Sequence, residues 1–154
     1  MNIHQDVLNL QAGMREKFAA FGVDLVLPPP SSLTLKLEYT GHEEGRMLRA
    51  RMPYNANMTN PIRLMQGGFI AAGIDDVMGP LSYMCAGQPV VTLQLSVTYL
   101  RPFLEQDEYV EIEAEVINKT RTILYMEATV KNKQGQLLCK ATAQSMIVAK
   151  DKVK

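Results

Sequence analysis

The first apolar pattern in the chain has the spacing of a helix. Apolar residues recur at steps of three and four near the start: Val7, Leu10, Met14, Phe18 and Phe21. This spacing predicts an amphipathic helix that ends near Gly22. The proline run 28–30, followed by Ser31 and Ser32, then predicts a stiff connector.

Alternation of apolar and polar residues predicts strands further along. Residues 33–40 alternate in this way, and residues 46–53 are expected to return beside them after a turn at 41–45. Four more strands are expected at residues 91–99, 110–116, 122–130 and 137–148. Turn-forming residues at 118–119 and 133–135 separate the later strands.

Between the second and third expected strands lies a helix with no polar face. After an irregular segment at residues 54–65, residues 67–85 are apolar or small nearly all round, and Asp75 and Asp76 are the only charges. Such a helix is buried, and Pro80 should kink it or end its regular part. The element order predicts an α+β domain in which one antiparallel sheet wraps around this helix. Because the helix needs cover on every side, we expect self-association.

Composition narrows the class of protein. The 154 residues suffice for one domain with a real core, and the formal net charge of zero argues against a nucleic-acid partner. No apolar segment approaches the length of a membrane span, and the start lacks the pattern of a secretory signal, so we expect a cytoplasmic protein. Cys85 and Cys139 are expected to be reduced thiols. With only His4 and His42 as histidines, no metal site is expected.

The most informative chemistry lies at the start of the central helix. Gly67 and Gly68 open it, and Asp75 follows two turns later. A helix N-terminus offers unpaired N–H groups and a positive dipole end, which can stabilise a developing oxyanion. We expect the carboxylate to reach the same ligand atom. Together these groups predict an oxyanion donor and a nucleophile or base for acyl transfer.

Each of these residues also has a structural interpretation. Asp75 could be a carboxylate bonded to backbone near Pro80, although burial of an unused carboxylate is costly. Asp76 is expected to point elsewhere, toward Arg63. Glycine pairs are commonly turns, so Gly67 and Gly68 alone are weak evidence.

Spacing and order together match a known family. Asn60 lies six positions before Gln66, Gly67 and Gly68 follow, and Asp75 lies nine positions after Gln66. The strand at 91–102 ends in Thr-Tyr-Leu-Arg-Pro. In these features the chain resembles the hotdog-fold acyl-CoA thioesterases, most closely the PaaI-like and THEM2-like branch of the 4HBT family. The resemblance implies a single domain over residues 1–154, with a hotdog core at 33–148 after an N-terminal helix and connector at 1–30.

The resemblance implies roles for four residues. Asp75 would be the nucleophile or the general base that activates water, and the Gly67 N–H would polarise the thioester carbonyl. Asn60 would orient the water or hold the carbonyl, unless it serves only turn chemistry. Thr92, on the strand expected to face the helix of the partner subunit, would hydrogen-bond the water or the carboxylate. In this family the active site spans the interface of a homodimer or homotetramer, so Asn60 and Gly67 would act with Asp75 of another chain.

Four further residues are expected to bind the substrate: Gln66, Gly68, Arg63 and Arg101. Arginine suits phosphate contacts with coenzyme A, although Arg63 and Arg101 could equally be surface residues. Gln66 stands where the family usually has histidine. Glutamine can donate and accept hydrogen bonds but cannot carry a titrating proton near neutral pH.

The leading hypothesis is therefore an acyl-CoA thioesterase (EC 3.1.2.-) that splits an acyl- or aryl-acyl-CoA into free acid and CoA. No cofactor is expected beyond the coenzyme A of the substrate. The alternative, motivated by Gln66, is a non-catalytic acyl-CoA-binding protein on the same fold. A dehydratase or hydratase ranks last because it needs a histidine in the site, and His4 and His42 lie in other segments. Aryl-acetyl, short-chain and medium-chain acyl groups all remain open.

Overall fold

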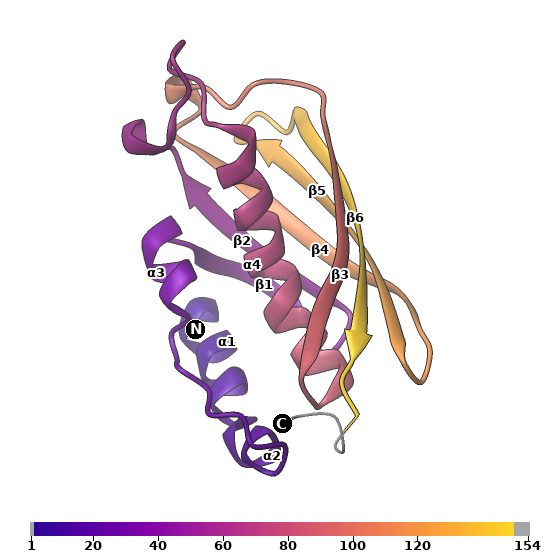
Figure 1. Cartoon of the computed structure of the whole chain (residues 1–154). Helices are drawn as coiled ribbons and strands as arrows, with labels where there is room; N and C mark the ends of the chain where they lie inside the picture. Colours follow the sequence, from indigo (N-terminus) through magenta and orange to yellow (C-terminus); the bar gives the residue numbers. More distant parts are fainter. Residues whose placement is uncertain (1, 150–154) are drawn as a thin grey trace.

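A six-stranded antiparallel sheet curls around one long helix in the computed structural model, which describes residues 2–149 (Figure 1). The sheet order is β1-β2-β4-β5-β6-β3. The strands are β1 (Glu38–Glu43), β2 (Met47–Pro53), β3 (Val90–Tyr99), β4 (Tyr109–Lys119), β5 (Ile123–Asn132) and β6 (Leu137–Ile147). The expected architecture, an antiparallel sheet wrapped around a central helix, is confirmed.

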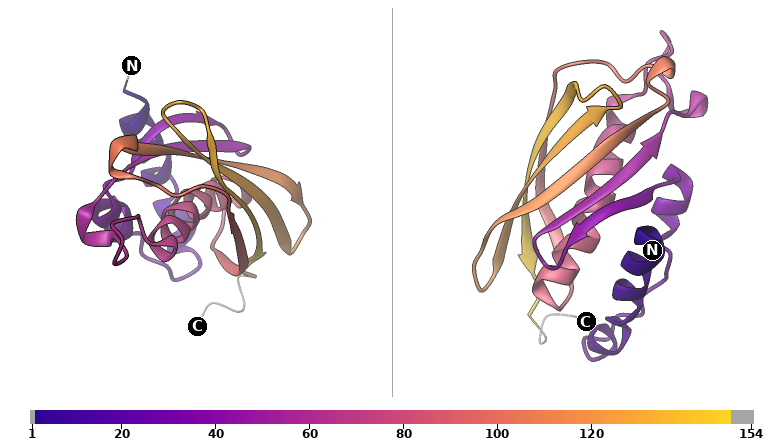
Figure 2. Two further views of the ribbon diagram at one scale, coloured as in Figure 1. Left: turned by 90° about the horizontal axis from the view of Figure 1, so that it is seen from above. Right: turned by 180° about the vertical axis from the view of Figure 1, so that it is seen from behind.

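The central helix α4 (Gly67–Ala86) lies in the hollow of the curved sheet (Figure 2). Its buried side chains, including Ile74 and Leu81, share one apolar core with sheet residues such as Leu48 and Ile112. The helix continues past Pro80 to Ala86, so the alternative that Pro80 ends its regular part is wrong, and a kink at Pro80 stays a prediction. The next turn is anchored instead: Leu81 and Ser82 are buried, and the Ser82 hydroxyl donates to the Gly79 carbonyl at 2.6 Å.

Three short helices replace the predicted N-terminal helix and connector. They are α1 (Ile3–Ala12), α2 (Arg15–Ala19) and α3 (Pro30–Leu35). A break at Gly13 and Met14 separates the first two, and Leu10 is 40% exposed, so the inward face is narrower than predicted.

The strand predicted to begin at residue 33 is wrong in its first half. Pro30 occupies the first position of α3, where its missing N–H costs nothing, and the helix ends at Lys36 in a left-handed conformation. Only from Glu38 does the chain enter the sheet. The alternating leucines resembled a strand, yet Leu33 is exposed on the surface of α3.

Two of the predicted turns lie within strands in the structure, while the other predicted elements in this paragraph begin and end close to their observed positions. β1 continues through Gly41 and His42 to Glu43, which leaves a turn of only residues 44–46. β4 likewise continues through residues 118–119. The strands predicted at 46–53, 122–130 and 137–148, the irregular segment at 54–65 and the turn at 133–135 are confirmed.

A β-bulge changes which residues of β3 face α4. Thr92 pairs with Ser145 and Gln94 pairs with Gln144, so Leu93 is an extra residue without a partner. Simple alternation would place Leu93 on the same face as Leu95. The bulge instead turns Leu93 outward, 56% exposed, and leaves Thr92 on the side of the sheet that faces α4.

Candidate functional site

Asp75 and Thr92 meet between α4 and β3. The Thr92 hydroxyl donates to Oδ1 of Asp75 at 3.0 Å. Asp75 is exposed, and within residues 2–149 no other side chain hydrogen-bonds its carboxylate. The second oxygen, Oδ2, is therefore open to water or to a ligand. The structure thus brings together two of the residues predicted for the site, and the bulge in β3 makes this contact possible.

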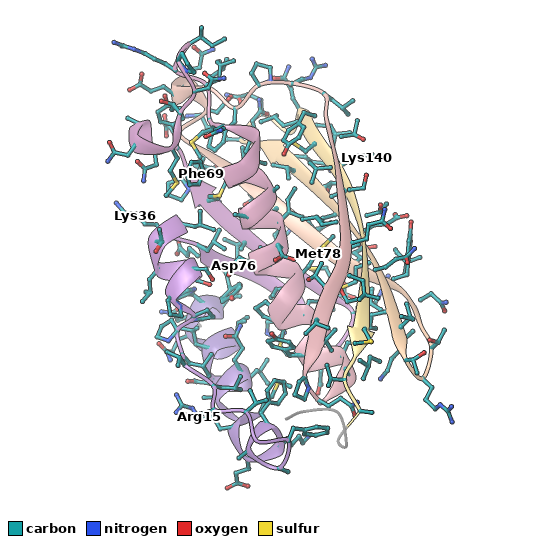
Figure 3. The ribbon with its side chains drawn as sticks, in the orientation of Figure 1. Arg15, Lys36, Phe69, Asp76, Met78 and Lys140 are labelled. Carbon is teal, nitrogen blue, oxygen red and sulfur yellow. The ribbon has the colours of Figure 1, made fainter. Side chains whose placement is uncertain are left out.

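The neighbouring Asp76 has a different environment. The hydroxyls of Ser31 and Ser32 on α3 donate to its Oδ1 and Oδ2, one to each oxygen. Asp76 is half-buried and points toward α3 (Figure 3). The prediction that it points toward Arg63 is wrong. Its carboxylate ties the N-terminal segment to the central helix, which is a structural task.

The N-terminus of α4 presents free backbone donors. Gln66 is the N-cap residue, and its side chain caps no N–H. Gly67 and Gly68 occupy the first turn, where N–H groups have no partner within the helix, and none of the described residues accepts a hydrogen bond from either N–H. Gln66 and Gly68 are both exposed. These donors and the positive end of the helix dipole suit an oxygen that gains negative charge.

Tyr99 at the end of β3 fixes this glycine turn. Its hydroxyl donates to the Gly67 carbonyl, and a Cβ at position 67 would come within 3.0 Å of its ring. Only glycine fits there without displacing the ring. A Cβ at Gly68 would meet nothing within 4 Å, so that position opens into free space. Burial, and to a lesser extent Cys139, raises the pKa of Tyr99, which keeps its hydroxyl protonated as a donor.

Asn60 and Arg101 lie beside this turn. A hollow of about 340 Å³ is lined in part by Asn60, Gly67, Tyr99 and Arg101. The Asn60 Oδ1 accepts the backbone N–H groups of Ile62 and Leu64, each at 3.1 Å. Asn60 therefore stabilises a turn, as one of the two interpretations predicts. Because its Oδ1 is occupied, only its side-chain NH2 group can donate to a ligand.

Arg63 takes no part in this hollow. It is exposed, its φ is +61°, and its carbonyl accepts the Tyr54 hydroxyl at 2.9 Å. The structure therefore places Arg63 on the loop before α4 without bringing it to Gly67, while Arg101 lies against the same hollow as Gly67.

Asp75 and Thr92 line a different cavity. It has a volume of about 560 Å³ and lies between α3, α4 and β3. Gly67 and Asp75 are two turns apart, about 12 Å along the helix axis. A donor must lie about 3 Å from the carbonyl oxygen and a nucleophile about 3–3.5 Å from the carbon. The expectation that Gly67 and Asp75 of the same chain reach one ligand atom is therefore wrong.

One stripe of α4 is open in the single chain. Gly68, Phe69, Ala72 and Asp75 are exposed and follow each other at helical spacing. The expectation of burial all round is not met by this chain alone. The stripe includes both Asp75 and one of the two opening glycines, so the two candidate half-sites lie on the same uncovered face.

Two further reactive groups near the core, Cys139 and Tyr83, are held in their protonated forms. Burial raises the pKa of Cys139 to about 11, so its thiol stays protonated at neutral pH. Burial, and then the negative charge of Asp75, raises the pKa of Tyr83. Cys85 and Cys139 are both free thiols. Asp75, by contrast, is exposed on the open face of α4.

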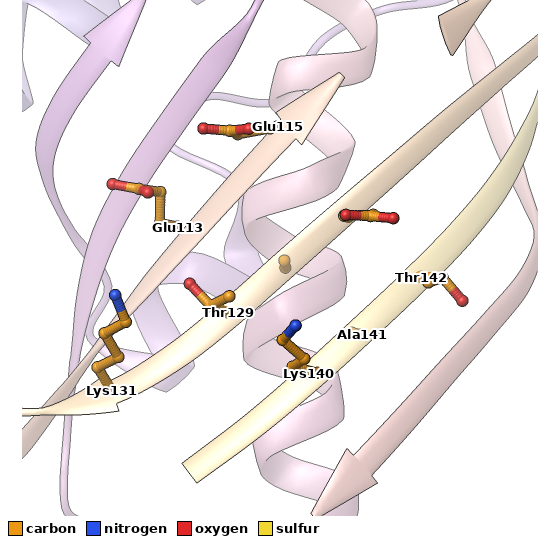
Figure 4. Close-up of a pocket in the computed structure, with 9 residues that line it drawn as sticks. Glu113, Glu115, Thr129, Lys131, Lys140, Ala141 and Thr142 are labelled. Atoms are coloured by element: carbon orange, nitrogen blue, oxygen red, sulfur yellow. The ribbon is translucent and has the colours of Figure 1, made fainter. Parts of the chain in front are cut away.

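Another hollow lies on the far side of the sheet and contains none of the predicted site residues. Figure 4 shows it on the outer face of β4, β5 and β6, with α4 behind the strands. Its volume is about 410 Å³, and its lining alternates carboxylates such as Glu113 and Glu115 with Lys131 and Lys140. Mixed charges of this kind are typical of a solvated sheet face.

Between residues 2 and 149, no three or more His, Cys, Asp or Glu side chains are grouped so that they could hold a metal ion. None of the helices in that span is both long and apolar enough to cross a membrane.

Sequence reasoning missed four residues that shape the site. Tyr99 belongs to the alternating strand at 91–99 and to its Thr-Tyr-Leu-Arg-Pro ending, and Tyr83 lies within the helix predicted at 67–85, but neither has a predicted role. The sequence predicts only a connector at Ser31 and Ser32. Their role depends on contacts with Asp76, which lies 45 positions after Ser31 and 44 after Ser32. No local pattern in the sequence indicates such contacts.

Comparison by sequence gives a match to one family. A family model described as the thioesterase superfamily matches residues 64–139, which include the opening of α4, Asp75 and Thr92. Comparison with curated proteins finds no significant match.

Solved structures share the fold. A thioesterase from Haemophilus influenzae has a TM-score of 0.72 and 21% identity, with 79% of this chain and 84% of that chain covered. A phenylacetic acid degradation-related protein from Ralstonia eutropha has a TM-score of 0.71 and 24% identity, with 84% and 96% covered. A Streptococcus mutans protein bound to acetyl-CoA has a TM-score of 0.67 and 24% identity, with 73% and 89% covered.

Proposed function

From the match to the thioesterase superfamily and the hotdog fold, we propose that this protein is an acyl-CoA thioesterase. It hydrolyses an acyl- or aryl-acyl-CoA to the free acid and CoA. The observation that carries the proposal is the division of the site. The free N–H groups of the glycine turn at Gly67 and the open carboxylate of Asp75 lie at two ends of one uncovered stripe of α4, about 12 Å apart. The acetyl-CoA bound by the Streptococcus mutans protein supports CoA thioesters as the ligand class.

Two copies of the chain would bring the half-sites together. In an isologous pair the same surface packs on itself around a two-fold axis. If the axis passes level with Ala71, midway between positions 67 and 75, antiparallel α4 helices place Gly67 of one copy opposite Asp75 of the other, twice. Gly68 and Ala72 on the exposed stripe are small enough to allow close approach. The active site then lies between the copies, in a dimer or in a tetramer built from it.

The two sheet edges favour the same pairing. At the β1 edge, the Tyr39 N–H donates to Nδ1 of His4 at 3.0 Å, so α1 covers that edge. The β3 edge is ten residues long, and near its start Val91 and Leu93 are exposed. An uncovered edge strand is a template for pairing with another chain. Antiparallel pairing of β3 with its own copy extends the sheet and sets the two α4 helices side by side.

In the proposed reaction, Asp75 attacks the thioester carbon or takes a proton from the water that attacks it. Thr92 holds the carboxylate or the water through the contact it already makes. The carbonyl electron pair moves onto oxygen, where the Gly67 N–H of the second copy and the helix dipole stabilise it. The intermediate then collapses, the C–S bond breaks, and CoA leaves as a thiolate. In the water route, the thiolate takes up the proton that Asp75 accepted. If Asp75 itself attacks, a mixed anhydride of Asp75 remains, and a water molecule hydrolyses it to the free acid and the Asp75 carboxylate.

Gln66 is compatible with this chemistry. A thiol has a pKa of about 8.5, so a thiolate leaves without a strong proton donor. Gln66 need only position the thioester or the water by hydrogen bonding, which glutamine can do. At the helix N-cap, with its side chain exposed, it lies where such a contact is possible. Asn60 and Arg101 line the neighbouring hollow and are proposed to hold the CoA part.

The test is release of free thiol from a panel of acyl-CoAs by wild-type protein and Asp75→Ala. We expect turnover by the wild type that disappears in the variant. Turnover that survives unchanged in Asp75→Ala would contradict the assigned role of Asp75. Saturable acyl-CoA binding without turnover, even at high protein concentration, would favour the alternative of a non-catalytic binder.

A further inference from the structure

Two of the first four N–H groups of α4 are free to bind an oxygen atom of a ligand. The N–H groups of Phe69 and Ile70 both donate to the Gln66 carbonyl, at 3.0 and 3.3 Å. Those of Gly67 and Gly68 have no acceptor among the described residues. Gly68 is exposed, so a ligand can approach this second donor as well as the first.

The peptide group between Gly67 and Gly68 links one of these donors to Tyr99. Its carbonyl belongs to Gly67 and accepts the Tyr99 hydroxyl, whereas its N–H belongs to Gly68. A hydrogen bond to a peptide carbonyl draws electron density toward the oxygen. The N–H of the same peptide then becomes a stronger donor, because hydrogen bonds in a chain polarise one another. The Tyr99 hydroxyl is thus the first member of a chain that ends at the free Gly68 N–H.

Contacts on two sides hold Tyr99 in this place. Within the sheet it pairs with Cys139 of β6, and the N–H of the next residue, Leu100, donates to the Leu138 carbonyl at 2.7 Å. On the other side its ring lies against Gly67, where a Cβ would come within 3.0 Å of the Tyr99 Cζ. Burial raises the pKa of Tyr99, so its hydroxyl stays protonated and can donate at neutral pH.

A second tyrosine makes the same kind of contact with a different consequence. The Tyr54 hydroxyl donates to the Arg63 carbonyl at 2.9 Å. The N–H of that peptide group belongs to Leu64, and it donates to Oδ1 of Asn60 at 3.1 Å. Because this N–H is already used inside the loop, polarisation of the peptide does not reach a ligand. Tyr54 therefore offers a matched control for Tyr99.

We propose that Tyr99 is a positioning residue that polarises the peptide between Gly67 and Gly68. The Gly68 N–H thereby becomes a second donor to the oxyanion, beside the Gly67 N–H. Tyr99 keeps its proton and touches neither the thioester nor the attacking group. The inference rests on the proposed function, because an oxyanion forms at this turn only if a thioester is hydrolysed there.

The expected size of the effect follows from two general magnitudes. Loss of one oxyanion donor costs about 10²- to 10³-fold in kcat, and one hydrogen bond in a chain strengthens the next by about 10–30%. Removal of the Tyr99 hydroxyl should therefore lower kcat by about two- to eightfold. KM should change little, because the negative charge develops only in the transition state.

The experiment varies the donor strength of the Tyr99 hydroxyl in steps. Tyr99→Phe removes the hydroxyl, and replacement of Tyr99 by 3-fluorotyrosine keeps it but makes it a stronger donor. Steady-state thiol release at neutral pH gives kcat and KM for an acyl-CoA that the wild type hydrolyses. We expect kcat to rise in the order phenylalanine, tyrosine, 3-fluorotyrosine, with KM unchanged. The same two replacements at Tyr54 should leave kcat at the wild-type value.

The fluorinated protein keeps the shape of the wild type, so it decides the question even if Tyr99→Phe failed to fold. Equal kcat values with tyrosine and 3-fluorotyrosine at position 99 would overturn the inference, because a purely structural contact does not follow donor strength. Equal changes in kcat at Tyr54 and Tyr99 would overturn it as well. Both results leave the proposed function standing, whereas hydrolysis of no thioester by wild-type protein would overturn that function and this inference together.

Discussion

Asp75 and Asp76 are neighbours on one helix, yet they have different partners. Both oxygens of Asp76 accept hydroxyls from Ser31 and Ser32, which ties α3 to α4. Asp75 accepts one hydroxyl, from Thr92, and lies on the face of α4 that no other part of the described chain covers. The identity of the residue is the same in both places. What separates a structural carboxylate from a candidate catalytic one is whether its oxygens are already occupied.

The difference also shows why two adjacent carboxylates can serve separate tasks. Successive helical residues are about 100° apart around the axis, so the two side chains leave α4 toward different neighbours. The α3 side is closed by hydrogen bonds, and the β3 side is open. Substitutions at the two positions should therefore have effects that separate cleanly into rate and stability.

The largest expected effect comes from replacing the open carboxylate. Asp75→Asn keeps the shape of the side chain but removes its charge and basicity, so kcat should fall by about 10²- to 10⁴-fold. The matched change, Asp76→Asn, should keep kcat near the wild-type value. Steady-state thiol release by both variants measures the difference. Equal losses of activity in the two variants would contradict the assignment of separate tasks.

Loss of the backbone donor at Gly67 should lower kcat almost as much as loss of the Asp75 carboxylate. Gly67→Pro removes the proposed donor N–H at the first helical position, where proline is well tolerated, and should lower kcat by about 10²- to 10³-fold. Gly67→Ala introduces crowding against Tyr99 but keeps the N–H, so it should retain much more activity. A similar loss in both variants would show that crowding rather than the donor is responsible.

On the closed side of α4, the expected effect is on stability. Asp76→Ala leaves the Ser31 and Ser32 hydroxyls without their acceptor and should lower the free energy of unfolding by about 1–3 kcal/mol. Urea denaturation at fixed protein concentration measures this loss. Asp75→Ala, whose side chain is exposed, serves as the comparison and should be nearly neutral. The account fails here if Asp75→Ala is the more destabilising of the two.

Among these substitutions, the smallest expected effect on kcat comes from removing the Thr92 hydroxyl, on the open side of α4. Thr92→Val keeps the shape of threonine but removes the hydroxyl that donates to Asp75. One hydrogen bond of this kind is worth about 0.5–1.5 kcal/mol, which corresponds to a fall in kcat of about two- to twelvefold. Thr98→Val, at an exposed position on the same strand, is the matched control and should have no effect.

The sequence predicts the elements of this fold better than the contacts between them. The apolar spacing of α4 and the alternation in the later strands follow from local periodicity, which survives folding. The bulge at Leu93 does not, because it is set by pairing with β6, and it reverses the orientation expected for Val91 and Leu93. In the same way, residues 33–35 alternate like a strand, although Pro30 starts a helix there.

In the candidate site, too, the sequence predicts single residues better than the contacts between them. The spacing of Gly67 and Asp75 identifies both groups. The resemblance implies that Thr92 faces the helix of the partner subunit, whereas the contact with Asp75 lies within one chain. That Gly67 and Asp75 of one chain are too far apart to share a ligand atom follows from the geometry of the helix. The roles of Ser31, Ser32 and Tyr99 depend on contacts between distant segments, which no local pattern encodes.

The most direct test of the shared site is a mixed oligomer of two inactive variants, Asp75→Asn and Gly67→Pro, purified through two different tags. If one copy supplies Gly67 and the other Asp75, each mixed dimer contains one intact site of two and should recover about half of the wild-type activity. If one chain supplied both groups, every site in the mixed oligomer would lack one of them. Activity no higher than that of either variant alone would contradict the account.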